Sequence, residues 1–256
     1  MGDPGFERAV RAAGGVSELA RRIGISQPSV SNWSRIPAER VLAVEAATGV
    51  ARAVLRPDLY AEGPAASDDI AVARAREYAL LAALLTRAPD AALLKRLARL
   101  EGGESPLGAA HAALAAAAKA SDADTVGREY FDLFTGVGRG ELLPYASFYL
   151  TGFLHERPLA RLRADLEAMG IERVEAQSEP EDHAGILCEI MAGLIDGDFA
   201  GPAAEQRRFF DQHMAPWIAR FFADLEGTKT AHFYRPVGTV GRLFIDIETQ
   251  AFALPG

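Results

Sequence analysis

Cysteine and long apolar runs are both scarce in this chain of 256 residues. The single cysteine, Cys188, excludes an internal disulfide framework and favours a reducing compartment. Apolar stretches such as residues 112–118 are too short and too rich in alanine to span a bilayer. The N-terminus, M-G-D-P-G-F-E-R, lacks the basic and apolar regions of a signal peptide. We therefore expect a cytoplasmic protein that is not inserted into a membrane.

Patterns that indicate catalysis or metal binding are also missing. The glycines of residues 136–140 follow an aromatic helical segment rather than a strand, and they lack the spacing of a phosphate-binding loop. No nucleophile elbow is present, and Cys188 lies within an apolar helical segment, where a buried thiol is inert. No pair of histidines or cysteines has the spacing of a zinc site. We expect no catalytic residue, no metal and no cofactor.

Positive charge is deficient overall, since the net charge is −8. The deficit is uneven along the chain. Residues 1–62 carry eight arginines and seven carboxylates, a balance of +1, so the remaining residues carry −9. An acidic body repels phosphate and attracts cationic partners. The N-terminal part alone would bind DNA modestly, and a homodimer or a partner would strengthen the binding.

The dominant pattern beyond residue 70 is helical. Alanine, leucine, arginine and glutamate are abundant there, and apolar residues recur three and four positions apart, as in residues 78–85, 93–100 and 159–169. The segment 63–69 is rich in small residues, proline and aspartate, which is typical of a linker. We predict an all-α protein with a small domain at 1–62, a linker at 63–69 and a domain of about eight to ten helices at 70–256.

Residues 16–33 have the pattern of a helix-turn-helix. Ala20 is small where two helices must touch, and Gly24 can adopt the left-handed conformation of a short turn. Ser26 lies where an N-cap belongs, and Val30 and Trp33 are spaced to share the buried face of the second helix. A helical hairpin without a ligand is the simpler alternative interpretation of this pattern.

This pattern leaves three polar side chains on the outer face of the second helix, where a recognition helix contacts the major groove: Gln27, Ser31 and Asn32. Nearby arginines would contact phosphate: Arg21, Arg22 and Arg35. The region resembles the Cro-like helix-turn-helix of phage repressors and of the YdaS group, over about residues 4–60. The resemblance implies a DNA-binding domain.

Four segments interrupt the plain helical pattern of the larger part: Tyr130-Phe-Asp-Leu-Phe-Thr-Gly136, Leu143-Pro-Tyr-Ala-Ser-Phe-Tyr149, Glu179-Pro-Glu-Asp-His183 and His213-Met-Ala-Pro-Trp217. Pro180 is predicted to open a helix, with Glu181 and Asp182 in its first turn. Asp182 and His183 are expected to reach solvent at this helix start. Simpler interpretations exist for each segment. The aromatic residues could pack in the core, the two carboxylates could favour the helix dipole, and His213 could be a buried histidine.

In order and spacing, the four segments together resemble the TorD/DmsD family of cytoplasmic chaperones for redox-enzyme maturation. The resemblance covers about residues 70–256, and the E-P-x-D-H segment is its most specific part. It implies an all-helical chaperone that binds the twin-arginine signal peptide or the apoprotein of a molybdenum enzyme while molybdopterin is inserted. Ala146 is a departure, because the family often has glutamate there.

The resemblance also implies which residues bind the client. Asp182 would recognise client arginine or polar backbone, His183 would orient it, and the aromatic residues would provide apolar contacts. The predicted client-binding residues are Glu179, Asp182, His183, Tyr145, Phe148, Tyr149, His213 and Trp217. The alternative function is a one-component transcriptional regulator, in which the helical domain serves as a sensor or dimeriser for the helix-turn-helix.

Overall fold

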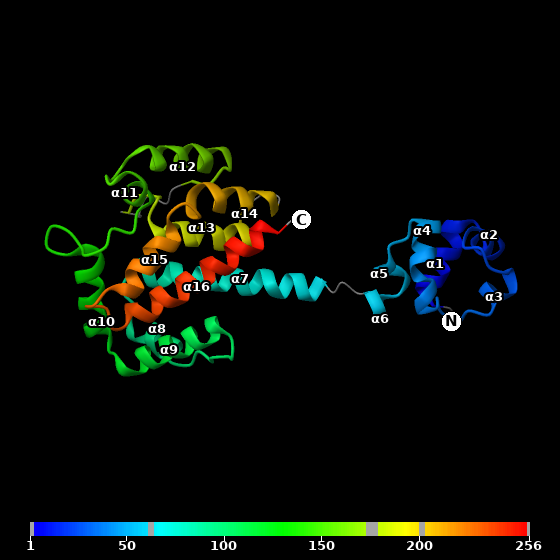
Figure 1. Cartoon of the computed structure of the whole chain (residues 1–256), viewed down its shortest axis with the longest axis horizontal. Helices are drawn as coiled ribbons and strands as arrows, with labels where there is room; N and C mark the ends of the chain where they lie inside the picture. The colour runs from blue at the N-terminus through cyan, green and yellow to red at the C-terminus, as the bar shows by residue number, and fades with distance from the viewer. Residues whose placement is uncertain (1–2, 61–63, 173–178, 200–202, 255–256) are drawn as a thin grey trace. The chain divides into compact units, whose positions relative to one another are not determined.

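The computed structural model describes residues 3–60, 64–172, 179–199 and 203–254. All regular elements in these ranges are helices, and within them the only β-type pairing is an isolated bridge between Tyr145 and His183. The predicted all-α class is therefore confirmed. The chain divides into two compact units, Met1–Ile70 and Ala71–Gly256, which are described separately below (Figure 1).

Residues 63–69 were predicted to be a linker, and most of this segment is helical in the structure. Helix α7 spans Pro64–Leu85, so the chain is helical from Pro64 onward, whereas residue 63 lies outside the described ranges. The prediction relied on composition alone. Proline is well accepted at the first position of a helix, because its missing N–H has no intrahelical partner there.

Unit 1 is a bundle of short helices: α1 (Pro4–Ala13), α2 (Val16–Arg22), α3 (Gln27–Ser31), the 3₁₀ turn η1 (Ala38–Arg40), α4 (Val41–Thr48), α5 (Arg52–Leu55) and α6 (Pro57–Tyr60). The predicted helix-turn-helix is present. Gly24 has a φ of 73° in the turn, and the Ser26 side chain accepts from the backbone N of Ser29 at the start of α3. Ala20 and Val30 are buried. Trp33 lies just beyond the end of α3 and is partly buried, and it packs against the same core cluster as Val30.

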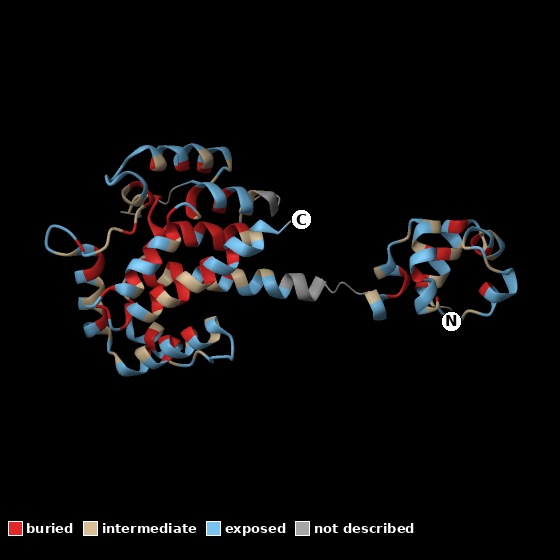
Figure 2. Cartoon of the chain, in the orientation of Figure 1, coloured by how far each residue is buried: buried red, intermediate tan, exposed pale blue. Residues whose placement is uncertain are grey.

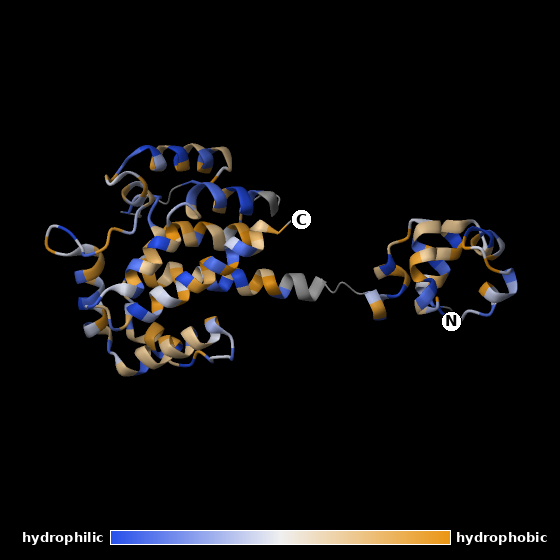
Figure 3. Ribbon diagram, in the orientation of Figure 1, coloured by the Kyte–Doolittle hydropathy of each residue, from blue (hydrophilic) through white to orange (hydrophobic). Residues whose placement is uncertain are grey.

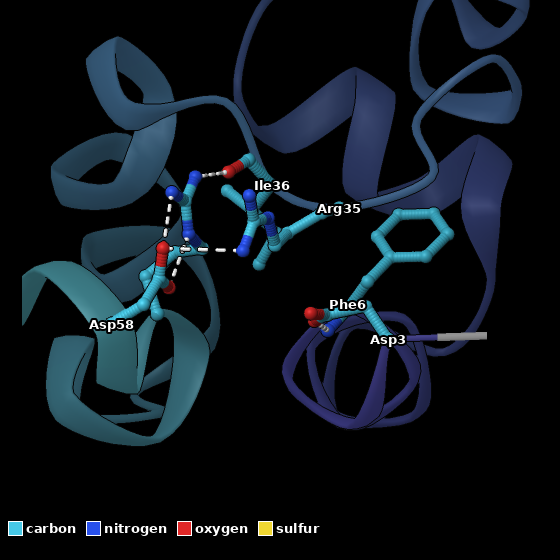
Figure 4. A network of polar contacts seen from close by, with 6 residues as sticks. Asp3, Phe6, Arg35, Ile36 and Asp58 are labelled. Atoms are coloured by element: carbon cyan, nitrogen blue, oxygen red, sulfur yellow. Dashed lines mark hydrogen bonds and ion pairs between the residues drawn. The ribbon is translucent and has the colours of Figure 1, made fainter.

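Figure 4 shows how the segment after α3 is held in unit 1. The buried Arg56 side chain donates to the backbone oxygen of Ile36 and to both carboxylate oxygens of Asp58. Arg35 donates to the same carboxylate at 3.1 Å. The hydrogen bond from Arg56 is the main cause of the low pKa of Asp58, about 2, so this carboxylate stays ionised. At the start of the chain, the Asp3 side chain caps α1 by accepting from the backbone N of Phe6 at 3.0 Å.

Unit 2 contains ten α-helices in its described part, at the upper end of the predicted number. They are α7, α8 (Ala91–Leu97), α9 (Pro106–Ala120), α10 (Ala123–Tyr130), α11 (Ala146–Thr151), α12 (Arg157–Ala168), α13 (Ala184–Asp196), α14 (Ala203–Phe209), α15 (Ile218–Gly227) and α16 (Tyr234–Ala253). Helix α13 lies at the centre. Ten of its 13 residues are buried, which requires apolar side chains on all faces of the helix (Figures 2 and 3).

Two π-helical turns extend helices of unit 2. Residues Phe131–Thr135 continue α10, and residues Phe210–Met214 continue α14. The first turn falls within the motif Tyr130–Gly136, and the second ends on the first two residues of the motif His213–Trp217. A π turn inserts one residue into a helix and is frequent at functional sites. Here the second turn places His213 beside α12, where its Nε2 lies 2.8 Å from Oδ2 of Asp165.

Side chains far away in the sequence satisfy several helix ends of unit 2. The Glu129 carboxylate accepts from the backbone N of His232, Phe233 and Tyr234 at 2.8–3.1 Å, and so caps the start of α16. The hydroxyls of Tyr130 and Tyr234 donate to the backbone oxygens of Leu85 and Leu84, at the end of α7. These hydrogen bonds provide partners for backbone N–H and C=O groups that have no partner within the helix at its ends.

A buried ion pair joins α7 to α16. Glu248 is 1 % exposed and accepts from Arg74 at 2.7 and 2.8 Å and from the Tyr78 hydroxyl at 3.1 Å. Burial, followed by the Glu248 carboxylate, raises the pKa of Tyr78 well above its ordinary value, so the hydroxyl remains a donor. The pair fixes the register of two long helices whose sequences are 174 residues apart.

Candidate functional site

The E-P-E-D-H segment lies before a helix rather than inside one. Helix α13 begins at Ala184, so Glu181 and Asp182 do not occupy its first turn as predicted. His183 is the N-cap of α13, and its Nδ1 accepts from the backbone N of Gly185 at 3.1 Å. Burial lowers the pKa of His183 to about 4, so the imidazole is a neutral acceptor. The prediction that Asp182 and His183 reach solvent is wrong, because they are 1 % and 3 % exposed.

Asp182 is the N-terminal cap of a different helix, α11. Its Oδ2 accepts from the backbone N of Ser147 at 2.8 Å, and its backbone oxygen accepts from Ala146 at 3.0 Å. In return, the backbone oxygen of Pro144 accepts from Ala184 at 2.7 Å, at the start of α13. The L-P-Y-A-S and E-P-E-D-H segments therefore form one structural element, in which each segment completes the start of the other's helix.

Tyr145 lies over this pair of helix starts. Its hydroxyl donates to Oε2 of Glu179 at 2.5 Å, and its ring meets the His183 ring edge-on with 5.2 Å between centroids. Burial, with help from the Glu179 carboxylate, raises the pKa of Tyr145, so the hydroxyl remains a donor. Tyr145 thus contacts two other predicted residues directly, Glu179 and His183.

A second cluster of predicted residues forms between α11 and α15. The Tyr149 ring packs against Trp217 at 5.3 Å, and its hydroxyl donates to Asp224 at 2.9 Å. Trp217 is buried, and its indole N–H donates to the backbone oxygen of His213 at 2.8 Å. Phe148 lies under the Arg139 guanidinium, 5.1 Å from the ring centroid. For Trp217, the simpler interpretation as a core residue is correct.

A cavity of about 540 Å³ opens between α11, α12 and α13. The predicted residues Asp182 and His213 both line it, although they come from motifs about thirty positions apart in the sequence. Its walls are largely apolar, and its lining is Ala146, Leu150, Pro158, Arg161, Leu162, Ala164, Asp165, Asp182, Leu187, Gln212 and His213. Burial lowers the pKa of His213, and its hydrogen bond to Asp165 opposes that shift.

Phe148 and Tyr149 line a neighbouring cavity of about 410 Å³. Leu150 lines both cavities and is 45 % exposed. Just beyond it, Phe153 and Leu154 are 69 % and 40 % exposed. Leu150, Phe153 and Leu154, which we call the apolar rim, are thus exposed within five positions of the chain, and Leu150 is the member that lines both cavities.

Sequence reasoning missed Leu150, Arg161 and Asp165. Leu150 directly follows the L-P-Y-A-S-F-Y motif, and this position is the feature of the sequence that could have indicated its place at the site. Arg161 and Asp165 are four residues apart on α12, a spacing that in sequence resembles an ordinary solvated helix face. Ser147, in the same motif, has a buried hydroxyl without a hydrogen-bond partner in the described part of the chain.

In unit 1, the predicted DNA-contacting residues are exposed. Gln27, Ser31 and Asn32 all lie on the surface at α3, and the Gln27 amide donates to Ser31 Oγ at 3.0 Å. The predicted phosphate-contacting arginines are exposed as well, but each is ion-paired. Glu18 pairs with both Arg21 and Arg22, at 2.6 and 3.1 Å, and Asp58 pairs with Arg35, as Figure 4 shows.

In the described ranges, no helix is both long and apolar enough to cross a lipid bilayer. Within those same ranges, histidine, cysteine, aspartate and glutamate side chains form no group of three or more that could hold a metal ion.

Comparison with known proteins gives matches for both units. Residues 101–223 match the family model of the nitrate reductase delta subunit, and residues 6–64 match that of the bacterial toxin YdaS. The chaperone protein TorD of Vibrio cholerae is 30% identical over 102 residues, which are 36% of this chain and 46% of the relative. TorD of Aliivibrio salmonicida is 26% identical over 135 residues, 49% of this chain and 63% of the relative.

The chain spans about half the length of the curated relatives it matches. A solved structure of a redox-enzyme maturation protein from Archaeoglobus fulgidus covers 68% of this chain and 93% of its own, at 19% identity and a TM-score of 0.45. Both of these TorD relatives are named as chaperones. Residues 101–223 are therefore similar to the nitrate reductase delta subunit family, part of the chain is similar to TorD chaperones, and residues 6–64 are similar to YdaS.

Proposed function

We propose that this protein is a cytoplasmic chaperone for the maturation of a molybdenum enzyme. Unit 2 binds the twin-arginine signal peptide or the folding apoprotein of the client and holds it while molybdopterin is inserted. The chaperone names of the relatives support this function. The observation that carries it is the cavity of about 540 Å³ in which Asp182 and His213 meet, because these residues come from two separate family motifs.

The shape and chemistry of this cavity suit a peptide. Its volume lies within the roughly 300–1,000 Å³ range of ligand pockets, and its walls combine apolar side chains with a few polar groups. The rim of Leu150, Phe153 and Leu154 extends the apolar surface along which a client segment would lie. In this arrangement Asp182 contributes polar contact at the cavity wall. His183 and Tyr145, which do not line the cavity, hold the helix starts that shape it.

The first test replaces Leu150 with glutamate. We expect binding of a twin-arginine signal peptide to weaken about tenfold or more, because a carboxylate replaces an apolar contact worth roughly 1.5–3 kcal/mol when buried. The measurement is calorimetric titration with the full-length chain. Val137→Glu is the matched control, since Val137 is 98 % exposed and lines neither cavity. Wild-type affinity in Leu150→Glu would remove the cavity from the proposed function.

We also propose that unit 1 binds DNA, so that the chain joins a chaperone to a DNA-binding domain. The supporting observation is the exposed row of Gln27, Ser31 and Asn32 at α3, at the position of a recognition helix. Amide side chains on such a helix can contact adenine with two hydrogen bonds. The ion pairs of Arg21, Arg22 and Arg35 leave these cations partly neutralised, so we expect modest affinity for the isolated unit.

For DNA binding, two substitutions should have different effects. Asn32→Ala should relax sequence preference, with a loss of roughly 1–3 kcal/mol of discrimination at one base pair. Arg35→Ala should weaken binding to all sequences and reduce the salt dependence by about one ion. Selection from random DNA followed by titration at several salt concentrations measures both effects. Failure of the intact protein to enrich any sequence would contradict this role for unit 1.

A further inference from the structure

The Glu18 carboxylate of unit 1 is shared by two neighbouring arginines of α2. It accepts from Nε and Nη2 of Arg21 at 3.0 and 2.6 Å, and from Nε of Arg22 at 3.1 Å. Arg22 also donates to the backbone oxygen of Ala47 at 3.3 Å, near the end of α4. Within the described part of the chain, Arg21 has no hydrogen bond apart from those to Glu18, and its side chain is 73 % exposed. Arg22 is therefore anchored between two helices, whereas Arg21 is held by the carboxylate alone.

The same arrangement recurs at Asp58. Arg56 donates to both carboxylate oxygens at 2.8 Å and to the backbone oxygen of Ile36, and its side chain is buried. Arg35 donates to Oδ2 of Asp58 at 3.1 Å, and its side chain is 52 % exposed (Figure 4). Each of the two carboxylates is thus shared by one arginine that is anchored to a backbone oxygen and one arginine that is exposed.

Sharing allows the exposed arginine to leave without stranding a negative charge. Departure of Arg21 or Arg35 breaks an exposed ion pair, which contributes little to stability, and the anchored arginine still neutralises the carboxylate. A phosphate group can accept the freed guanidinium with two parallel hydrogen bonds, as a carboxylate does. The anchored arginines are less free to move, because their departure would also break a hydrogen bond to a backbone oxygen.

We propose that the two shared carboxylates compete with DNA phosphate for the exposed arginines, Arg21 and Arg35. Arg22, for which the sequence predicts a phosphate contact, instead keeps Glu18 neutralised when Arg21 turns to the DNA. The inference rests on the proposed DNA binding by unit 1, and it gives two neighbouring arginines different roles. It also makes Glu18 a residue that limits the affinity for DNA.

The first test compares Arg21→Gln with Arg22→Gln in the full-length chain. The two substitutions are matched, because each removes one positive charge that pairs with Glu18. Arg21→Gln should lower the slope of log K against log salt concentration by about 0.9, the effect of one lost phosphate contact. Arg22→Gln should lower this slope by less than about half as much, because no phosphate contact is lost. The probe is a fluorescein-labelled DNA duplex of random sequence, titrated by anisotropy at several salt concentrations, and circular dichroism verifies the fold.

The second test is Glu18→Gln, which keeps the inference falsifiable if Arg22→Gln fails to fold. We expect this variant to bind the same duplex about two- to fivefold more tightly, the effect of removing one exposed ion pair. Glu7→Gln is the matched control, since Glu7 is an exposed carboxylate on α1 with no ion pair in the described part of the chain. A gain in Glu7→Gln equal to that in Glu18→Gln overturns the competition, because the effect would then be one of net charge.

The outcomes distinguish this inference from the function on which it rests. Equal slopes in folded Arg21→Gln and Arg22→Gln, with the wild type still binding DNA, overturn the different roles of the two arginines alone. Unchanged or weaker binding by Glu18→Gln overturns the competition in the same way. Absence of DNA binding in every protein, including the wild type, overturns the DNA-binding function of unit 1 and the competition together.

Discussion

Replacing His183 with alanine is expected to lower the free energy of unfolding of unit 2 by roughly 2–4 kcal/mol. The backbone N of Gly185 would lose its acceptor in a buried position, and α13 would lose its N-cap. The space against the Tyr145 ring would be left empty. Urea unfolding followed by Trp217 fluorescence, in a Trp33→Phe background, measures unit 2 alone.

The His183 imidazole should also make the free energy of unfolding of unit 2 decrease at acidic pH. Burial lowers the pKa of His183 from 6.5 to about 4, so the unfolded chain takes up a proton at a higher pH than the folded chain. The stability that neutral His183 provides is complete above about pH 6.5 and is lost as the pH falls from 6.5 towards 4, a change on the order of 3 kcal/mol. His183→Asn keeps an N-cap acceptor and does not titrate, so it should lose less stability over this interval. Equal pH dependence in the two proteins would contradict the assignment.

Measurements of client binding distinguish two roles for Asp182 and His183, namely stabilising the starts of α11 and α13 and contacting the client. If Asp182 and His183 only brace α11 and α13, peptide affinity in Asp182→Asn and His183→Ala should fall in step with stability. If Asp182 also contacts the client at the cavity wall, Asp182→Asn should lose affinity while it remains folded. Full affinity in a well-folded double variant would exclude both residues from the site.

The second large effect is expected for Glu129→Ala, with a loss of roughly 3–5 kcal/mol of unfolding free energy. The Glu129 carboxylate accepts from three consecutive backbone N–H groups and neutralises the positive end of α16, a helix of 20 residues. Glu129→Gln should lose about half as much, because one oxygen remains as an acceptor. The same fluorescence-monitored unfolding measures both variants.

Asp124→Ala is the control for Glu129, since Asp124 is an exposed carboxylate on the same helix, α10. We expect a change within about 0.5 kcal/mol for this surface position. A loss in Glu129→Ala no greater than in Asp124→Ala would show that water replaces the carboxylate at the start of α16.

Local patterns predicted the fold class and the helix-turn-helix correctly. Ser26 caps α3, Gly24 adopts a left-handed conformation, and apolar spacing gives the helices of unit 2. These features depend on a few neighbouring residues, so the sequence displays them directly. Three of the four motifs of unit 2 also meet in space, through the contacts of Tyr145 with His183 and of Tyr149 with Trp217.

The roles of Asp182 and His183 were not visible in the sequence, because they depend on tertiary contacts. Pro180 followed by two carboxylates has the pattern of a helix start, but Asp182 caps α11, which begins at residue 146. No spacing rule predicts a cap that comes from another helix. The pairing of Arg163 with Glu181 was hidden in the same way, since the two residues are 18 positions apart on different segments.

The long-range caps of unit 2 also set the order in which it can be completed during synthesis. Helix α16 receives its cap from Glu129, about a hundred residues earlier, and the Glu248 that pairs with Arg74 lies near the end of the chain. On the ribosome, α7 and α10 emerge long before these partners do. Unit 1 depends on residues that emerge together and can fold early, whereas unit 2 waits for its last helix. A nascent chain stalled before residue 234 should therefore present a folded unit 1 and an incomplete unit 2.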